Sequence, residues 1–285
     1  MNTFGGNWTE NKIEILVEYA KAYLTIMNSY AKQFGWKLMY FDGFAGSGLI
    51  VKGKKENRKE IVGAARRIIE IEEPMPFDEY YFVEMDKKNM KELEQSTKAA
   101  FLEKKIYTST EDCNIKLQGL AAFLNTSKGK AYKILAFIDP CGMQLKWDSI
   151  KHLKNLPIDV WILVPTGMGV SRLLRKDGKI SDAWLEKLEV FLGMEREEIL
   201  QFFYKEKEVQ TLFGTETIIT KEEKAIGKSA ELYRNRLSMI FKFVSETYVL
   251  KTESNTTLFH FLLASNNDKA HKIANDIVRK YNKKV

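Results

Sequence analysis

The chain has 285 residues, of which 45% are hydrophobic and 29% charged, a composition typical of a globular protein with one large domain or one domain carrying an insert. No apolar run approaches the roughly 18 to 20 residues of a membrane helix, and the N-terminal segment lacks the basic and apolar regions of a signal peptide. Two cysteines and three scattered histidines predict neither a disulfide framework nor a metal site. We therefore expect a cytoplasmic protein. Its net charge of +7 allows a nucleic acid partner without requiring one.

Helical and strand patterns alternate along the first part of the chain. Apolar residues spaced three and four apart predict helices at residues 9–32, 61–72, 87–103, 115–125 and 149–156. Short apolar runs predict strands at residues 36–41, 80–83, 106–108, 134–138 and 160–164. Five strands alternating with helices through short connections indicate a parallel sheet with right-handed crossovers.

The remaining third of the chain is predicted to complete this sheet after an insert. Residues 165–178 are irregular, and residues 181–240 read as a mostly helical, charged insert or subdomain, interrupted near 209–220. Two further strands follow at 243–250 and 258–263, joined as a hairpin, and a helix ends the chain. We therefore expect an α/β fold with a seven-stranded sheet and helices on both faces. Its parts are a cofactor-binding portion at 1–180, the insert at 181–240, and the completing strands and helix at 241–285.

A basic segment interrupts the pattern at residues 52–60, where five of nine residues are lysine or arginine and none is apolar. One interpretation is an exposed, solvated loop. The other is an arm that contacts phosphates, since ligands of open α/β sheets bind beyond the carboxyl ends of the strands.

Acidic residues follow four successive predicted strands. They are Asp42, Glu84 with Asp86, Asp112, and Asp139 followed by Pro140. In a doubly wound sheet, these four strand ends lie side by side along one edge. A nucleoside cofactor needs close backbone approach at the first end, a carboxylate for its ribose at the second, and a polar contact to adenine at the third.

The first strand end leads into a glycine-rich turn, the stretch Gly43, Phe44, Ala45, Gly46, Ser47 and Gly48. Phe44 and Ala45 would crowd the helix N-terminus on which a pyrophosphate binds, so a nicotinamide-dependent oxidoreductase is the weaker interpretation. An acid followed by Gly-x-x-Gly-x-Gly instead resembles the S-adenosylmethionine site of Rossmann-like methyltransferases. That resemblance implies contacts to the cofactor from Asp42 and the turn, ribose binding by Glu84 with Asp86 close by, and Asp112 beside adenine. It also implies a seven-stranded sheet whose last strand is antiparallel.

A narrower resemblance rests on three tracts, at residues 41–48, 82–86 and 137–142, together with the opening helix from Trp8 to Tyr23 and the tract at 263–265. These resemble the bacterial three-Cys-motif partner family. Membership implies a methyltransferase relative, and it suggests a protein partner that carries a cysteine motif.

Asp139 and Pro140 are the best catalytic candidates. They resemble the strand end of amino-group methyltransferases of nucleic acids, in which an acid or amide and a backbone carbonyl accept hydrogen bonds from the target amine. Cys141 and Gly142 replace the second proline and the aromatic residue of that motif. The alternative is an Asp-Pro turn that only ends the strand.

Cys141 raises a second mechanism, because pyrimidine C5 methyltransferases place a Pro-Cys near this strand end and use its thiolate as a nucleophile. A buried small residue is the alternative for Cys141, and packing is the interpretation for Cys113. The leading hypothesis is an S-adenosylmethionine-dependent methyltransferase acting on a nucleic acid base, with an exocyclic amino group favoured. The alternative is a non-catalytic, methyltransferase-like protein that binds nucleic acid or a cysteine-motif protein.

Overall fold

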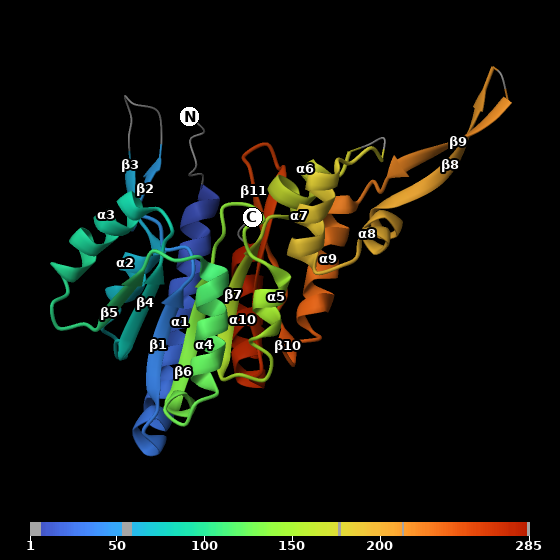
Figure 1. Cartoon of the computed structure of the whole chain (residues 1–285). Helices are drawn as coiled ribbons and strands as arrows, with labels where there is room; N and C mark the ends of the chain where they lie inside the picture. Colours follow the sequence, from blue (N-terminus) through green and yellow to red (C-terminus); the bar gives the residue numbers. More distant parts are fainter. Residues whose placement is uncertain (1–6, 53–58, 176–177, 213, 284–285) are drawn as a thin grey trace.

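A central sheet of eight strands runs through the computed structural model, which describes residues 7–52, 59–175, 178–212 and 214–283. The strand order is β10-β12-β7-β6-β1-β4-β5, and β11 also pairs with β12 (Figure 1). The strands are β1 (Lys37–Asp42), β4 (Glu79–Val83), β5 (Ile106–Ser109), β6 (Tyr132–Ile138), β7 (Ile158–Val164), β10 (Phe243–Val244), β11 (Tyr248–Lys251) and β12 (Thr257–Ser265). Five neighbouring strands are parallel, in the sheet order β7, β6, β1, β4 and β5, and β12 is antiparallel to β7. This arrangement confirms the predicted Rossmann-like α/β architecture.

The eighth strand arises because the run expected as one strand at 243–250 is divided in two. Strands β10 and β11 both pair with β12. Between them, the Ser245 amide still donates to the Leu263 carbonyl at 2.8 Å, but the Leu263 amide donates to the Ser245 hydroxyl at 2.9 Å. A side-chain oxygen thus accepts the bond that a backbone carbonyl would take in a continuous ladder, and the strand is interrupted there.

Helices cover both faces of the sheet, because successive side chains of each strand point to opposite sides. Leu38 and Tyr40 of β1 pack with one set of helices, whereas Met39 and Phe41 pack on the opposite face. The first set comprises α1 (Asn7–Phe34), α2 (Ala64–Ile69), α3 (Lys87–Lys98) and α10 (Asp268–Asn282). The second face carries α4 (Cys113–Leu124), the short turn η1 (Gly129–Ala131) and α5 (Trp147–Lys151). Among the described residues, no helix has the length and apolar character that crossing a bilayer requires.

The prediction of a helix from residue 61 is wrong, because residues 59–62 form a strand. Strands β2 (Leu49–Lys52) and β3 (Lys59–Val62) make an antiparallel hairpin, and α2 begins only after Gly63. Ile61 had been counted into the helical pattern, yet β-branched residues of this kind suit a strand at least as well. Most of the predicted basic loop, residues 53–58, lies outside the described residues.

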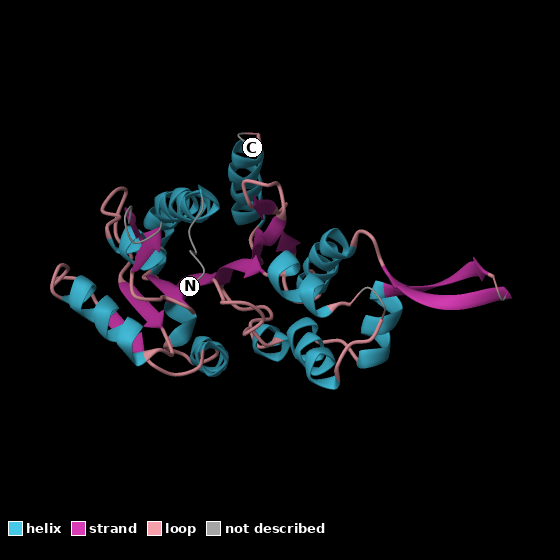
Figure 2. Ribbon diagram, turned by 90° about the horizontal axis from the view of Figure 1, so that it is seen from above, coloured by secondary structure: helices cyan, strands magenta, loops and turns pink. Residues whose placement is uncertain are grey.

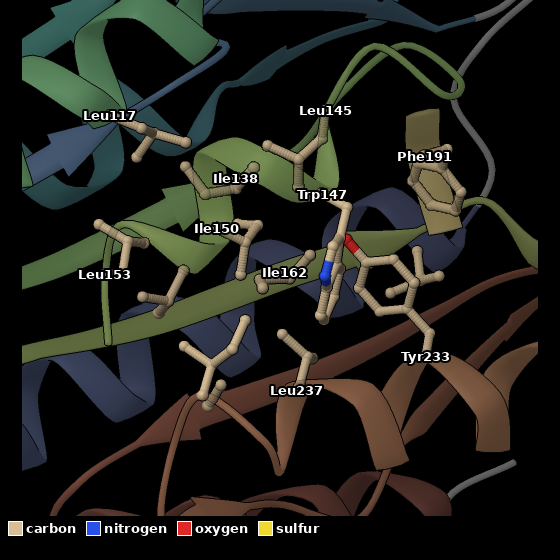
Figure 3. Close-up of a cluster of buried hydrophobic side chains, with 14 of the residues drawn as sticks. Leu117, Ile138, Leu145, Trp147, Ile150, Leu153, Ile162, Phe191, Tyr233 and Leu237 are labelled. Atoms are coloured by element: carbon tan, nitrogen blue, oxygen red, sulfur yellow. The ribbon is translucent and has the colours of Figure 1, made fainter. Parts of the chain in front are cut away.

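The predicted insert packs on the α4 and α5 side of the sheet. It contains α7 (Asp182–Leu192), α8 (Arg196–Phe203) and α9 (Ala225–Leu237), and it is reached through the turn η2 (Thr166–Val170) and α6 (Ser171–Leu173). The Tyr233 ring stacks on Phe191 with centroids 5.0 Å apart and meets Trp147 of α5 edge-on at 5.5 Å (Figure 3). One continuous apolar cluster therefore joins the insert to the sheet.

The predicted interruption near residues 209–220 is a hairpin of β8 (Tyr204–Thr211) and β9 (Gly214–Lys221). This two-stranded ribbon projects away from the rest of the molecule (Figures 1 and 2). Its strands pair only with each other, so it lies outside the central sheet.

Candidate functional site

A cleft of about 820 Å³ opens at the carboxyl ends of β1, β4 and β6, where β1 is flanked by β4 on one side and β6 on the other. The strand order reverses at this point, which is where ligands of open α/β sheets bind. The candidate catalytic and cofactor-binding residues predicted from the sequence all line this one cleft: Asp42, Gly43, Phe44, Ala45, Gly46, Gly48, Glu84, Asp86, Asp112, Asp139, Pro140 and Cys141.

The glycine-rich turn is held against the neighbouring strands by its own amides. The Gly43 amide donates to the Phe137 carbonyl of β6 at 2.9 Å, and the Ala45 amide donates to the Val83 carbonyl of β4 at 2.9 Å. The Gly46 amide donates to the Glu84 carboxylate at 3.0 Å. Because these three hydrogen bonds tie the turn to both sides of β1, its backbone forms a preorganised wall of the cleft.

Gly43 is required by close packing beneath this turn. A Cβ atom at this position would lie 2.5 Å from the Cys113 sulfur and 2.8 Å from Cδ1 of Ile138. Cys113 is buried, and burial raises the pKa of its thiol well above the usual range. These contacts support the interpretation of Cys113 as a packing residue.

Asp42 is buried at the end of β1, with 1% of its surface exposed. Its carboxylate accepts hydrogen bonds from the Phe44 amide at 3.1 Å and the Tyr40 hydroxyl at 3.3 Å. Burial raises its pKa to about 7, and the nearby Asp139 carboxylate adds to this, whereas the two hydrogen bonds and Lys12 act in the opposite direction. Asp42 therefore changes charge close to neutral pH.

Two of the other predicted acids also cap helices. Asp86 accepts the amides of residues 88 and 89 at the start of α3, both at 2.9 Å, and Asp112 accepts the Asn114 amide at the start of α4 at 2.6 Å. Glu84 accepts the Gly46 amide on one oxygen and the Asp86 amide on the other, at 2.8 Å. A carboxylate has about four acceptor positions, so Glu84 can still accept bonds from a ligand.

Lys12 of α1 lines the cleft but was not among the candidate residues predicted from the sequence. It is 5% exposed and forms an ion pair with Oδ2 of Asp139. The other carboxylate oxygen, Oδ1, accepts no hydrogen bond from the described residues. A signal was present, since Lys12 is in line with Leu16 and Ala20 on the apolar face of the helix, and a lysine there requires a partner.

The Asp139 turn is closed by local hydrogen bonds. The Gly142 amide donates to the Pro140 carbonyl at 2.9 Å, and the Cys141 amide donates to the Gln144 side chain at 3.0 Å. Cys141 is exposed, so its interpretation as a buried small residue is wrong. Partial desolvation by the cleft, and then the Asp139 and Glu84 carboxylates, raise the pKa of its thiol, which disfavours the thiolate that a nucleophile needs.

The charge of the cleft is strongly negative among the described residues. Six carboxylates and one lysine line it: Asp42, Glu84, Asp86, Glu111, Asp112, Asp139 and Lys12. A phosphate would be repelled here, whereas a cationic ligand would be attracted. The described residues contain no group of histidine, cysteine and acidic side chains arranged to hold a metal ion.

No protein-family model matches the chain, and no curated protein matches its sequence. Among solved structures, a Legionella pneumophila protein is similar at 15% identity and a TM-score of 0.40, with 90% of this chain and 97% of that chain covered. An S-adenosylmethionine-dependent methyltransferase from Clostridium acetobutylicum has 10% identity, a TM-score of 0.35 and coverage of 88% and 92%. Trm1 from Pyrococcus horikoshii in complex with S-adenosyl-L-methionine has 10% identity, a TM-score of 0.35 and coverage of 92% and 64%. These values are too low to carry an argument about activity, and membership of the three-Cys-motif partner family stays a prediction.

Proposed function

We propose that the protein is an S-adenosylmethionine-dependent methyltransferase that acts on a nucleic acid base, with an exocyclic amino group as the favoured acceptor. The observation that carries this proposal is the convergence of an anchored glycine-rich turn and acids from four strand ends in one cleft.

The donor set of the cleft fits this cofactor better than a dinucleotide. S-adenosylmethionine carries a sulfonium, an ammonium and one carboxylate group and no phosphate, so it is a net cation. The six carboxylates and one lysine that line the cleft among the described residues suit this charge. A pyrophosphate loop also leads directly into a long helix. Here the hairpin β2–β3 follows the glycine turn, and the subsequent helix α2 has only six residues.

Specific side chains are assigned to parts of the cofactor. Glu84 binds the ribose hydroxyls through its remaining acceptor positions, and Asp112 accepts a hydrogen bond from the adenine amine. Backbone of the turn from Gly43 to Gly48 contacts the amino acid portion. When bound, the cofactor would supply an electrophilic methyl group for transfer to the acceptor.

Asp139 and the Pro140 carbonyl then orient the target amine. Oδ1 of Asp139 accepts one amine hydrogen, while Lys12 holds the carboxylate in place through Oδ2. The Pro140 carbonyl keeps one acceptor position beside its bond to the Gly142 amide. Two such acceptors leave the nitrogen lone pair free to face the methyl group.

A second candidate function is a non-catalytic partner protein of the same fold, in a complex with nucleic acid or a cysteine-motif protein. Two observations favour it: Lys12 already forms an ion pair with Asp139, and Cys141 and Gly142 provide no aromatic ring for base stacking. Membership of the three-Cys-motif partner family would agree with either function.

Calorimetric titration with S-adenosylmethionine tests the proposal. The wild-type protein is expected to bind, and Glu84→Gln is expected to weaken binding at least tenfold, because a neutral amide is a poorer ribose acceptor and also loosens the Gly46 anchor. Glu92→Gln, on the exposed surface of α3, is the matched control and should bind like wild type. A folded wild-type protein that binds reduced nicotinamide dinucleotide but not S-adenosylmethionine would contradict the proposal.

A further inference from the structure

A second cleft lies on the face of β1, β4 and β5 that also carries α4, and its charge is opposite to that of the first. It has a volume of about 640 Å³. Resting on the proposed function, we propose that this cleft binds a nucleotide of the single-stranded nucleic acid that carries the acceptor base. The acid-lined cleft admits a base but repels the phosphates of its strand, so those phosphates need another surface.

The floor of the second cleft is a row of aromatic rings in register across three strands. Phe41 of β1 pairs with Tyr81 of β4, which pairs with Tyr107 of β5. The rings of Phe41 and Tyr81 stack at 5.8 Å between centroids, and those of Tyr81 and Tyr107 at 6.4 Å. Exposure rises from 1% at Phe41 to 46% at Tyr107, so the outermost ring offers an open face at the edge of the sheet.

Four lysines surround these rings: Lys37, Lys105, Lys116 and Lys128. Glu79, the one acidic residue that lines this cleft in the described part of the chain, already accepts a hydrogen bond from the Tyr132 hydroxyl at 3.2 Å and lies 3.9 Å from Lys37. Lys116 pairs with Glu111 at 2.6 Å. Neither Lys105 nor Lys128 has an ion pair with another described residue, so both ammonium groups are available to an anion.

This combination selects a ligand with an aromatic ring and a negative charge. Base–aromatic stacking accepts any base, and lysines around it attract the phosphates, which is how single-stranded nucleic acids are bound without sequence preference. A purely apolar ligand would leave the lysines unused, and inorganic phosphate would leave the rings unused.

The two clefts are close enough to serve one strand. Phe41, in the floor of the second cleft, directly precedes Asp42, which lines the first. At about 3.3 Å per residue, the far end of the second cleft at Lys37 lies about 17 Å along β1 from Asp42. Strand β5 lies at the edge of the sheet (Figure 1). A nucleic acid chain can therefore reach the second cleft from that side.

Fluorescence anisotropy with labelled 12-residue oligoadenylate RNA tests this site. Tyr107→Ala is expected to weaken binding at least about fivefold, and Tyr107→Phe to keep it, because the phenyl ring still stacks. The double variant Lys105→Glu/Lys128→Glu is expected to lower the slope of log affinity against log salt by about 1.4, the value for two lost phosphate contacts of a single strand. The charge-matched control Lys187→Glu/Lys242→Glu, on exposed positions in the insert and before β10, should bind the RNA more tightly than that double variant.

Unchanged RNA affinity in Tyr107→Ala and in Lys105→Glu/Lys128→Glu would overturn the proposal, as would equal losses in the two double variants. Adenosine monophosphate that competes as well as the oligonucleotide, per nucleotide, would show a free-nucleotide site and overturn the assignment to a strand. Each variant is also titrated with S-adenosylmethionine. If the wild type binds RNA but not the cofactor, the proposed function alone is contradicted. If the cofactor binds but the second-cleft variants keep the RNA affinity of the wild type, only the proposal for the second cleft is contradicted.

Discussion

The two clefts of this protein share the central strand β1 but differ in almost every physical property. The first cleft, at the carboxyl ends of the strands, is lined by six carboxylates and one lysine among the described residues, and backbone amides of a glycine turn form its wall. The cleft on the β1–β4–β5 face is lined by four lysines and one carboxylate, and aromatic rings form its floor. Position along the sheet produces this difference: the carboxylates of the first cleft follow the ends of the parallel strands, whereas the rings of the second cleft lie within β1, β4 and β5.

One sheet can thus provide separate binding surfaces for the two ligands of the proposed reaction. A cationic nucleoside needs negative surroundings, and a polyanionic strand needs positive ones. Placing both in one cleft would make each weaken the other. Substitutions that affect one cleft should therefore leave ligand binding in the other unchanged.

The largest effect is expected from Asp139→Ala, which removes the acceptor for the target amine. Methyl transfer from labelled cofactor to RNA should fall at least about a hundredfold, because positioning and hydrogen bonding at the reacting nitrogen are both lost. Oligoadenylate affinity, which depends on the second cleft, should stay within twofold of wild type.

Lys12→Met serves as the companion of that variant, because Asp139 stays in place but loses its partner. A smaller loss of about tenfold is expected, with partial recovery in Lys12→Arg, since a positioning residue contributes less than the group it positions. Asp148→Asn, in an exposed ion pair with Lys151, is the control and should transfer methyl groups normally. Full activity in Asp139→Ala would remove Asp139 from the catalytic assignment.

An intermediate effect is expected from the pH dependence of stability. Burial raises the pKa of Asp42 from 3.8 to about 7, so the folded protein binds a proton that the unfolded chain has released between these values. The stability that this proton contributes is complete below pH 4 and is lost as the pH rises through 7. Relative to Asp42→Asn, wild type should therefore lose about 3 kcal/mol of unfolding free energy between pH 4.5 and pH 8.

Urea unfolding of both proteins at these two pH values measures that difference. A constant gap between wild type and Asp42→Asn would show that Asp42 keeps an ordinary pKa and that the cleft tolerates its charge. Oligoadenylate binding should be insensitive to Asp42→Asn, because Asp42 does not line the second cleft.

The smallest effect is expected from Cys141→Ser. The raised pKa of the thiol disfavours the thiolate, and Cys141 is not one of the groups proposed to hold the target amine. Methyl transfer is therefore expected within about twofold of wild type. A loss of a hundredfold or more, together with a covalent RNA adduct trapped by wild type alone, would instead establish the thiolate mechanism of pyrimidine C5 methyltransferases.

Local sequence predicted the elements that depend on neighbours along the chain. Apolar residues at a period of 3.6 predicted the helices, and short apolar runs predicted the strands of the sheet. Acids after four of these strands indicated the candidate site. The pattern failed at Ile61, where β-branched residues fit two kinds of element, and at Ser245, whose hydroxyl interrupts a strand. In both places, pairing with a distant or facing segment decided between local alternatives.

The sequence by itself determined the α/β class, the glycine-rich turn and the row of acids at the strand ends, because strand ends and turns follow from short-range patterns. Only the tertiary structure decided that Lys12 pairs with Asp139, 127 residues away, and that Tyr81 and Tyr107 align with Phe41. Sheet order and register set these contacts, and both depend on packing between segments that have no fixed spacing in the chain. The second cleft has lysines from β1, the residue before β5, α4 and the loop after α4, so it exists only once those segments meet.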